Sequence, residues 1–95
     1  MSKDKKISVA LAAYKGEKFI EEQLKSILFQ LKENDEIIVS DDLPGGETEQ
    51  IVRAFAEKDA RVKYIEGPQK GLIKNFENAI KNCTGDYIFL CDQDD

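Results

Sequence analysis

The chain has 95 residues, 41% of them hydrophobic and 35% charged, which is the composition of one globular domain with a small core. Its net charge of −5 gives no broad electrostatic attraction for nucleic acid or anionic lipid, and its lack of histidine excludes a Ser-His-Asp triad, a Cys-His dyad and a histidine-ligated zinc site. With two cysteines and no long apolar run, we expect a reduced, cytoplasmic chain without a signal peptide or membrane span.

The first half of the chain alternates apolar runs with helical repeats. The β-branched run Lys6–Ala12 predicts a buried strand. Apolar residues at helical spacing then predict a helix over about Glu17–Leu31. Glu36–Ser40 predicts a second strand, and Asp41–Gly46, with one proline and two glycines, predicts a loop. A second helix follows over about Glu47–Lys58.

The second half repeats this alternation. Arg61–Glu66 alternates polar and apolar residues and predicts a third strand. Gly67-Pro68 predicts a turn, and apolar positions from Leu72 to Ile80 predict a third helix that ends near Thr84. Tyr87–Cys91 predicts the last strand.

Strands separated by helices predict right-handed crossovers, and therefore an α/β fold: a three-layer αβα arrangement with a mostly parallel, Rossmann-like sheet. The first, second and fourth strands are apolar on both faces, so we expect them to be central strands buried by helices on both sides. Ligands of such open sheets bind beyond the carboxyl ends of the strands, where the strand order reverses.

The first strand ends in Ala12-Ala13-Tyr14. Small residues would let a flat ligand approach the backbone, and Tyr14 offers an aromatic face for stacking. A tyrosine on an ordinary loop before a helix explains the same residues.

The second strand is followed by Asp41 and Asp42. Carboxylates only accept hydrogen bonds, so this pair suits the N–H edge of a base or a ribose diol. The alternative is that an aspartate here caps a turn through its own backbone.

The fourth strand leads into Asp92-Gln93-Asp94-Asp95. Residues i and i+2 of an extended chain face the same side, so Asp92 and Asp94 can converge on a hard divalent cation such as Mg²⁺ or Mn²⁺. A solvated acidic turn is the alternative for a short motif of this kind.

The residues after the third strand give a weaker indication of a binding site. Gln69, Lys70 and Lys74 could approach a phosphate, or the lysines could simply point outward from a helix start. Asn75 lies between apolar residues and could reach a ligand or cap a backbone group.

Five segments, in this order and spacing, resemble family 2 glycosyltransferases with the GT-A fold: I-S-V-A-L-A-A-Y-K-G, I-I-V-S-D-D, G-L-I-K-N-F-E-N-A-I, T-G-D-Y-I-F-L and C-D-Q-D-D. The likeness extends from about Lys6 to Asp95 and is greatest to bacterial rhamnosyl- and galactosyltransferase-like enzymes of polysaccharide biosynthesis in the cell envelope. It implies a sheet of order 3-2-1-4, with a nucleotide-sugar across the ends of the first, second and fourth strands.

The resemblance also implies roles for single residues. Tyr14 matches the residue that stacks on the base, and Ala12 lies beside it through its backbone. Asp42 matches the acid that reads the base edge, and Asp41 is its neighbour in the same pocket. Many members carry a basic residue near Asn75; here Lys74 fills that place, so both residues join the expected nucleotide-sugar site.

Asp92 and Asp94 match the D-x-D acids of the family. Asp92 would face the ribose and diphosphate, Asp94 would bind Mn²⁺ or Mg²⁺ directly, and Asp95 is a further contact. The metal would neutralise the nucleoside-diphosphate leaving group.

The resemblance implies an inverting transferase that moves a sugar from a nucleoside-diphosphate donor to a polysaccharide or lipid-linked acceptor. The family's catalytic base and acceptor-binding half follow the D-x-D motif, so we expect residues 1–95 to be one nucleotide-sugar-binding domain, a fragment that is inactive alone. Its missing half would leave apolar surface near the last strand, through which the chain could self-associate. The full-length enzyme would be cytoplasmic, at the inner face of the cell membrane.

Two other classes remain open. In a phosphotransferase of the haloacid-dehalogenase type, an apolar strand also ends in D-x-D, and Asp92 would be the nucleophile. A non-catalytic nucleotide-binding or interaction domain could keep this fold without the chemistry.

Overall fold

Strands and helices alternate through the computed structural model, which describes residues 5–15 and 18–92. The described elements, in chain order, are β1 (Ile7–Ala13), α1 (Ile20–Gln30), β2 (Glu36–Asp41), α2 (Glu47–Lys58), β3 (Val62–Glu66), α3 (Leu72–Lys81) and β4 (Tyr87–Asp92). The expected alternation of elements is confirmed. Within the described parts of the chain, no helix is long and apolar enough to cross a membrane.

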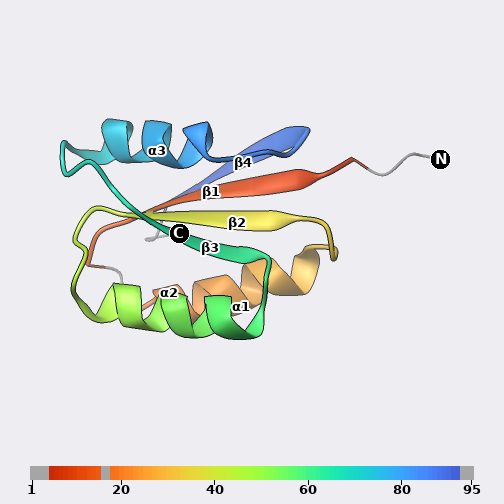
Figure 1. Ribbon diagram of the computed structural model, residues 1–95, viewed down its shortest axis with the longest axis horizontal. Coiled ribbons are helices and arrows are strands. Elements are labelled where there is room, and N and C mark those ends of the chain that lie inside the picture. The colour runs from red at the N-terminus through yellow and green to blue at the C-terminus, as the bar shows by residue number, and fades with distance from the viewer. Residues whose placement is uncertain (1–4, 16–17, 93–95) are drawn as a thin grey trace.

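The four strands form one parallel sheet with the order β3-β2-β1-β4, as the family resemblance predicts. Helices α1 and α2 cover one face of this sheet, and α3 covers the other (Figure 1). The fold is therefore the expected three-layer αβα arrangement. All strands run in one direction, so their carboxyl ends share one edge of the sheet.

The larger part of the core lies between the sheet and the helices α1 and α2. Leu11 and Val39 pack there against Leu24 of α1 and Val52 of α2, and all four are fully buried. On the other face, Ala79 of α3 packs against small or branched side chains of β1 and β2. Alternate strand residues thus enter two different cores, which is why β1 and β2 are apolar on both faces.

Strand β4 does not match the expectation of a central strand buried on both faces. Among the described strands it lies at the edge of the sheet, beside β1, and Tyr87, Ile88, Phe89 and Leu90 are each 40–60% exposed. Helix α3 packs on β1 and β2, and no described helix lies over the middle of β4. Apolar composition predicted the strand correctly, but it could not show which of its faces a described helix would cover.

Helix α1 begins at Ile20 rather than near Glu17, and it ends one residue before Leu31, which has an extended backbone. Three strands extend one residue further than expected, to Ala13, Asp41 and Asp92. Boundaries are the part of an element that periodicity fixes least, because end residues are held by only some of the interactions of the interior. Here the extension places Asp41 and Asp92 inside strands.

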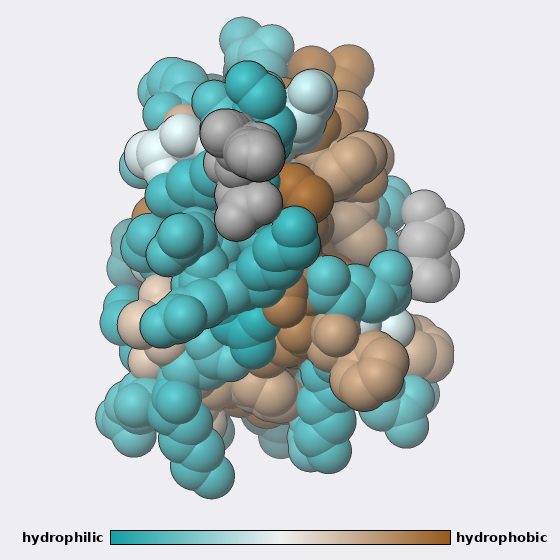
Figure 2. Space-filling view, turned by 90° about the vertical axis from the view of Figure 1, so that its right-hand side faces the viewer, coloured by the Kyte–Doolittle hydropathy of each residue, from teal (hydrophilic) through white to brown (hydrophobic). Residues whose placement is uncertain are grey.

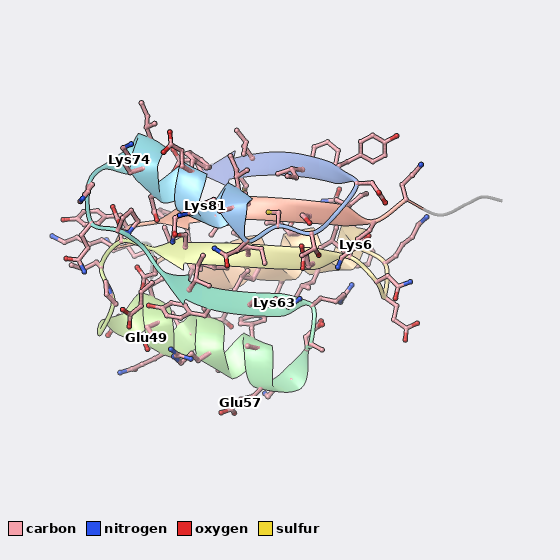
Figure 3. The ribbon with its side chains drawn as sticks, turned by 45° about the horizontal axis from the view of Figure 1, so that its top comes forward. Lys6, Glu49, Glu57, Lys63, Lys74 and Lys81 are labelled. Carbon is pink, nitrogen blue, oxygen red and sulfur yellow. The ribbon has the colours of Figure 1, made fainter. Side chains whose placement is uncertain are left out.

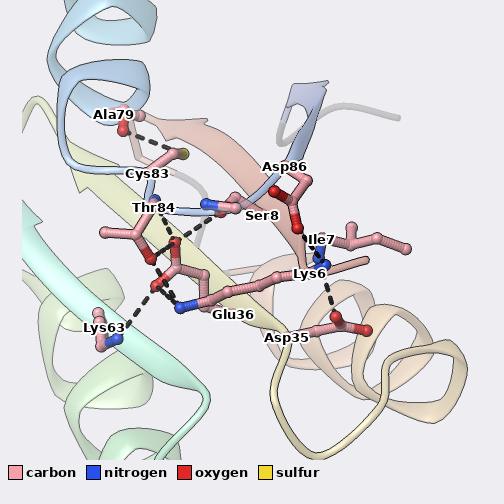
Figure 4. A network of polar contacts seen from close by, with 11 residues as sticks. Lys6, Ile7, Ser8, Asp35, Glu36, Lys63, Ala79, Cys83, Thr84 and Asp86 are labelled. Carbon is pink, nitrogen blue, oxygen red and sulfur yellow. Dashed lines mark hydrogen bonds and ion pairs between the residues drawn. The ribbon is translucent and has the colours of Figure 1, made fainter. Parts of the chain in front are cut away.

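The amino end of the sheet is held together by one buried carboxylate, Glu36, on β2 (Figure 4). It accepts hydrogen bonds from the Ser8 hydroxyl at 2.6 Å and the Thr84 backbone N–H at 2.7 Å. The Lys63 ammonium lies 3.1 Å away and that of Lys6 3.7 Å away. This carboxylate therefore joins β1, β2, β3 and the turn before β4 at the end of the sheet opposite the expected site.

Candidate functional site

The carboxyl ends of β1, β2 and β4 enclose a pocket of about 610 Å³. Its lining residues are Ala12, Ala13, Tyr14, Asp42, Leu43, Gln69, Gly71, Leu72, Asn75 and Asp92. Five residues expected in a nucleotide-sugar site, from four separate segments, are thus brought to one place. The pocket lies where strand order reverses, with β2 on one side of β1 and β4 on the other.

Ala12 and Asp92 stand next to each other across the β1–β4 pair. Ala12 is almost fully buried, so its main chain and small side chain form the floor of the pocket. The side-chain amide of Gln23 on α1 donates a hydrogen bond of 2.7 Å to the backbone oxygen of Asp92. The end of β4 is therefore fixed to α1, and the Asp92 carboxylate borders the open pocket.

Tyr14 follows β1 directly and forms part of the pocket rim. Its side chain is 51% exposed, and the Lys15 ammonium lies 5.7 Å from the ring centroid. A flat ligand in the pocket could stack on the exposed part of this ring. The structure thus leaves an aromatic surface where the sequence predicts base stacking.

Of the neighbouring acids Asp41 and Asp42, Asp42 is the one that lines the pocket. It is only 8% exposed. Its backbone N–H donates to the Ala13 oxygen at 2.8 Å, and one carboxylate oxygen accepts the Gln69 N–H at 2.7 Å. The carboxylate is therefore held in one orientation by the segment between β3 and α3. A fixed acceptor of this kind suits the N–H edge of a ligand.

Asp41 does not line the pocket. Successive strand residues face opposite sides of a sheet, and the fully buried Asp41 carboxylate accepts hydrogen bonds from the Tyr64 hydroxyl at 2.7 Å and the Leu43 N–H at 3.0 Å. Burial, together with the Asp41 carboxylate, raises the pKa of Tyr64 well above its usual value. The geometry matches the turn-capping alternative for Asp41, since its carboxylate contacts the backbone two residues ahead.

Asn75 lines the pocket but uses its amide inside the protein. The side-chain nitrogen donates to the backbone oxygens of Ala13 at 3.2 Å and Ser40 at 3.0 Å, and the side-chain oxygen accepts the Ser40 hydroxyl at 2.6 Å. The residue is 1% exposed. Of its two predicted uses, the capping of backbone groups is the one that these contacts show.

Lys74 lies outside the pocket. It is on the outer side of α3, where its ammonium is 3.5 Å from the Glu77 carboxylate (Figure 3). A separate surface hollow contains Lys74 together with Lys70 and Lys81. Lys74 and Asn75 are consecutive residues, about 100° apart around the axis of α3, so their side chains leave the helix on different faces and do not share a site.

Asp94 and Asp95 lie outside the described residues. Among the residues that are described, no group of three or more His, Cys, Asp or Glu side chains could hold a metal ion. Two carboxylates, those of Asp42 and Asp92, do line the pocket, and carboxylate oxygen is the donor that Mg²⁺ and Mn²⁺ prefer. Among the described residues, the pocket therefore offers carboxylate oxygens of the right kind but not a complete set of metal ligands.

Sequence reasoning did not single out Leu43 or Leu72, which give the pocket two apolar walls. It also missed the part played by Gly67, where a Cβ would meet the Asn75 side-chain oxygen at 2.5 Å and would also overlap the Asp42 carboxylate. The sequence signal for this close approach was the pair of glycines, Gly67 and Gly71, at the two ends of the segment. In the structure, Gln69 and Gly71 have positive φ angles of 60° and 99°. Such a backbone brings the segment close to β2.

Comparison with known proteins assigns the domain to a family. The profile described as Glycosyl transferase family 2 matches residues 8–95. The chain is 34% identical over 92 residues to the glycosyltransferase GlyA of Streptococcus pneumoniae, covering 97% of this chain and 13% of that protein. It is 30% identical over 92 residues to the GalNAc(5)-diNAcBac-PP-undecaprenol beta-1,3-glucosyltransferase of Campylobacter jejuni, covering 95% of this chain and 30% of that protein.

A crystal structure of S. aureus TarS aligns with a TM-score of 0.83 and 30% identity, over 95% of this chain and 28% of that one. The chain therefore belongs to glycosyltransferase family 2 and has the α/β fold of the GT-A glycosyltransferases. It spans well under half the length of these relatives. The family match favours a glycosyltransferase over the phosphotransferase that a lone D-x-D motif leaves open.

Proposed function

We propose that this domain binds the donor of an inverting glycosyltransferase, a nucleoside-diphosphate sugar whose sugar passes to a polysaccharide or lipid-linked acceptor. The observation that carries the proposal is the single pocket at the carboxyl ends of β1, β2 and β4. It combines an exposed aromatic ring, a fixed buried acceptor and a carboxylate at the strand end, contributed by Tyr14, Asp42 and Asp92.

Each of these groups suits one part of the donor. The Tyr14 ring would stack on the base, and the Asp42 carboxylate would accept from the N–H edge of that base. The Asp92 carboxylate would face the ribose and diphosphate from the end of β4. Asn75 would act indirectly, because its hydrogen bonds hold the ends of β1 and β2 on which Tyr14 and Asp42 stand.

A divalent cation is part of the proposal. Asp92, with Asp94 as the direct ligand, would hold Mn²⁺ or Mg²⁺ beside the diphosphate. The bound ion supplies positive charge that neutralises the leaving group. Without it, the two carboxylates and the diphosphate would repel one another, so donor affinity should depend on the metal.

Isothermal titration of the 95-residue chain with UDP, dTDP and GDP, each with and without Mn²⁺, tests the proposal. We expect binding of at least one nucleotide that Mn²⁺ strengthens about tenfold or more, and that Asp92→Asn and Asp94→Ala weaken to a similar extent. Glu57→Gln, on the exposed side of α2, is the matched control and should bind like the unaltered chain.

Each other outcome has a clear meaning. Binding that is equal with and without Mn²⁺ would replace the metal-dependent donor site with a simple nucleotide-binding module. No detectable heat with any of the three nucleotides would contradict the donor site itself. Loss of binding in the Glu57→Gln control would show that net charge, rather than the pocket, controls the interaction.

A further inference from the structure

The side chain of Gln23, on α1, contacts the end of β4. Its amide nitrogen donates a hydrogen bond to the Asp92 backbone oxygen at 2.7 Å and lies 3.1 Å from the Cys91 sulfur. Asp92 is the last residue of the strand and stands beside Ala12 of β1. Helix α1 therefore holds β4 at the point where this strand reaches the pocket.

The oxygen of the same amide has no hydrogen-bond partner among the described residues, although it is buried. A buried acceptor without a donor lowers the stability of a fold. An apolar side chain of the same length, such as methionine, would avoid this cost. Stability therefore does not explain an amide at position 23, and the contact that does distinguish it is the hydrogen bond from its nitrogen to the Asp92 oxygen.

Gln23 approaches β4 from the face of the sheet opposite the Asp92 carboxylate. The Cys91 side chain packs against the core that α1 and α2 form with the sheet. Successive strand residues face opposite sides, so the Asp92 side chain lies on the face of α3, whose residues Leu72 and Asn75 line the pocket. Gln23 is not among the described residues that line this pocket. It thus acts on the main chain of Asp92 and not on the ligand.

We propose that Gln23 is a positioning residue for Asp92, an inference that rests on the donor site proposed above. Pairing with β1 fixes the peptide on the amino side of Asp92, and the hydrogen bond from Gln23 fixes the peptide on its carboxyl side. With both peptides held, the Cα–Cβ bond of Asp92 keeps one direction, and the carboxylate is presented to the pocket. Groups held in this way bind better than mobile ones, because binding does not have to order them.

The effect of this contact should be confined to one end of the donor site. The Asp42 carboxylate, which is proposed to accept from the base, is oriented by the Gln69 N–H. It follows β2, which lies on the other side of β1 from β4. Loss of the Gln23 amide should therefore weaken binding of the diphosphate and Mn²⁺ beside Asp92 and leave binding of the base unchanged. A residue that only stabilised the fold would weaken both.

The fold itself should not depend on this contact. The opposite end of the sheet is closed by the hydrogen bonds of Ser8 and Thr84 to Glu36, and Figure 2 looks onto that end, whose surface is largely hydrophilic. Gln23→Met keeps the length of the side chain and removes the unpaired oxygen together with the donor. We therefore expect the variant to unfold at the same urea concentration as the unaltered chain.

Calorimetric titration of the 95-residue chain with UDP, dTDP and GDP in the presence of Mn²⁺ tests the positioning role. For each nucleotide that the unaltered chain binds, Gln23→Met should raise the dissociation constant about fivefold, the effect of one lost hydrogen bond. Gln23→Glu keeps the shape but places a carboxylate beside the Asp92 oxygen, so it should raise the constant further. Gln30→Met is the matched control on the same helix: the Gln30 amide donates to the Ser26 backbone oxygen at 3.3 Å, and its loss should change nothing.

A second titration separates positioning from stability. Uridine, thymidine and guanosine carry the same bases without phosphate, and NMR spectra of the isotope-labelled chain can follow their weak binding. The dissociation constant of the nucleoside should agree within about twofold between Gln23→Met and the unaltered chain. Circular dichroism in urea establishes that each variant is folded to the same extent.

Three results would overturn the inference. Equal dissociation constants for the diphosphate in Gln23→Met and the unaltered chain would show that Asp92 does not need this hydrogen bond. A parallel loss of nucleoside and diphosphate binding would make Gln23 a residue of general stability. An unaltered chain that binds none of the nucleotides would contradict the proposed donor site as well, so this failure is distinct from the first two, in which the unaltered chain still binds.

Discussion

At the scale of single residues, burial separates the side chains that shape the pocket from those that can meet a ligand. Tyr14 and Asp92 border open space, whereas Asn75 is 1% exposed and makes all three of its side-chain hydrogen bonds within the protein. A buried amide with satisfied partners stabilises a unique arrangement, and its removal leaves polar groups without those partners. Asn75 is thus a positioning residue for the two strand ends.

Replacement of this amide should destabilise the domain. We expect Asn75→Ala to lower the free energy of unfolding by roughly 2 kcal/mol, because it removes three buried hydrogen bonds and opens a small cavity. Urea denaturation followed by circular dichroism measures the change.

Asn82→Ala is the matched control for that measurement. The Asn82 side chain is exposed on the last turn after α3 and donates one hydrogen bond, to the Asn78 oxygen at 2.8 Å. Its loss should change the free energy of unfolding by less than about 0.5 kcal/mol. Equal losses in the two variants would show that the Asn75 contacts do not hold the strand ends.

At the scale of elements, the segment between β3 and α3 positions the acceptor in the pocket. The backbone of Gln69 donates to Asp42, and Gly67 approaches Asp42 and Asn75 so closely that any side chain would displace them. The Gly67 N–H also donates to the Asp41 oxygen at 2.7 Å. The segment is therefore attached to the end of β2 by backbone contacts on either side of the glycine.

A single methyl group at this glycine tests the arrangement. We expect Gly67→Ala to weaken binding of the nucleotide identified by titration about tenfold, because the new Cβ moves the Asp42 carboxylate and the Asn75 amide. The readout is the dissociation constant in the presence of Mn²⁺. Gly46→Ala is the control, since a Cβ there meets only the Leu43 oxygen at 3.8 Å, and unchanged affinity in both variants would contradict a positioning role for the segment.

The elements themselves could be predicted from the sequence because their signals are local. Periodicity identified the strands and helices, and the family resemblance supplied the strand order that the structure shows. Periodicity alone could not show how far β4 is exposed, because apolar residues on both faces predict a buried strand but do not identify the helices that cover it. The division between Asp41 and Asp42 also required the structure, since it depends on one extra residue of β2 and on the Tyr64 hydroxyl.

At the scale of the whole molecule, the two ends of the sheet differ in structure. The carboxyl end has an open pocket lined by Asp42 and Asp92, whereas the amino end is closed around the buried Glu36 carboxylate. Burial alone would raise the pKa of Glu36, but hydrogen bonds from Ser8, the Thr84 backbone and Lys63 outweigh it and lower that pKa from 4.5 to about 2. The ionised form of Glu36 is therefore the form that the folded chain favours at this end of the sheet.

That difference predicts a specific dependence of stability on pH. A carboxyl whose pKa is lower in the folded chain stabilises the fold above about pH 4.5, and this contribution disappears as the pH falls toward about 2. Glu36→Gln should therefore lower the free energy of unfolding by roughly 3 kcal/mol at pH 7, and the gap to the unaltered chain should narrow below pH 4.5. Urea denaturation at a series of pH values measures the gap.

The control for this series is Glu57→Gln, which removes a carboxylate from the exposed side of α2 (Figure 3). Its effect at pH 7 should stay within about 0.5 kcal/mol, because an exposed side chain makes little net contribution. A Glu36→Gln deficit that is the same at pH 7 and pH 2.5 would mean that shape and packing, rather than the ionised carboxylate, hold the amino end together. A deficit that becomes smaller as the pH falls would instead show that the ionised Glu36 carboxylate holds this end of the sheet together.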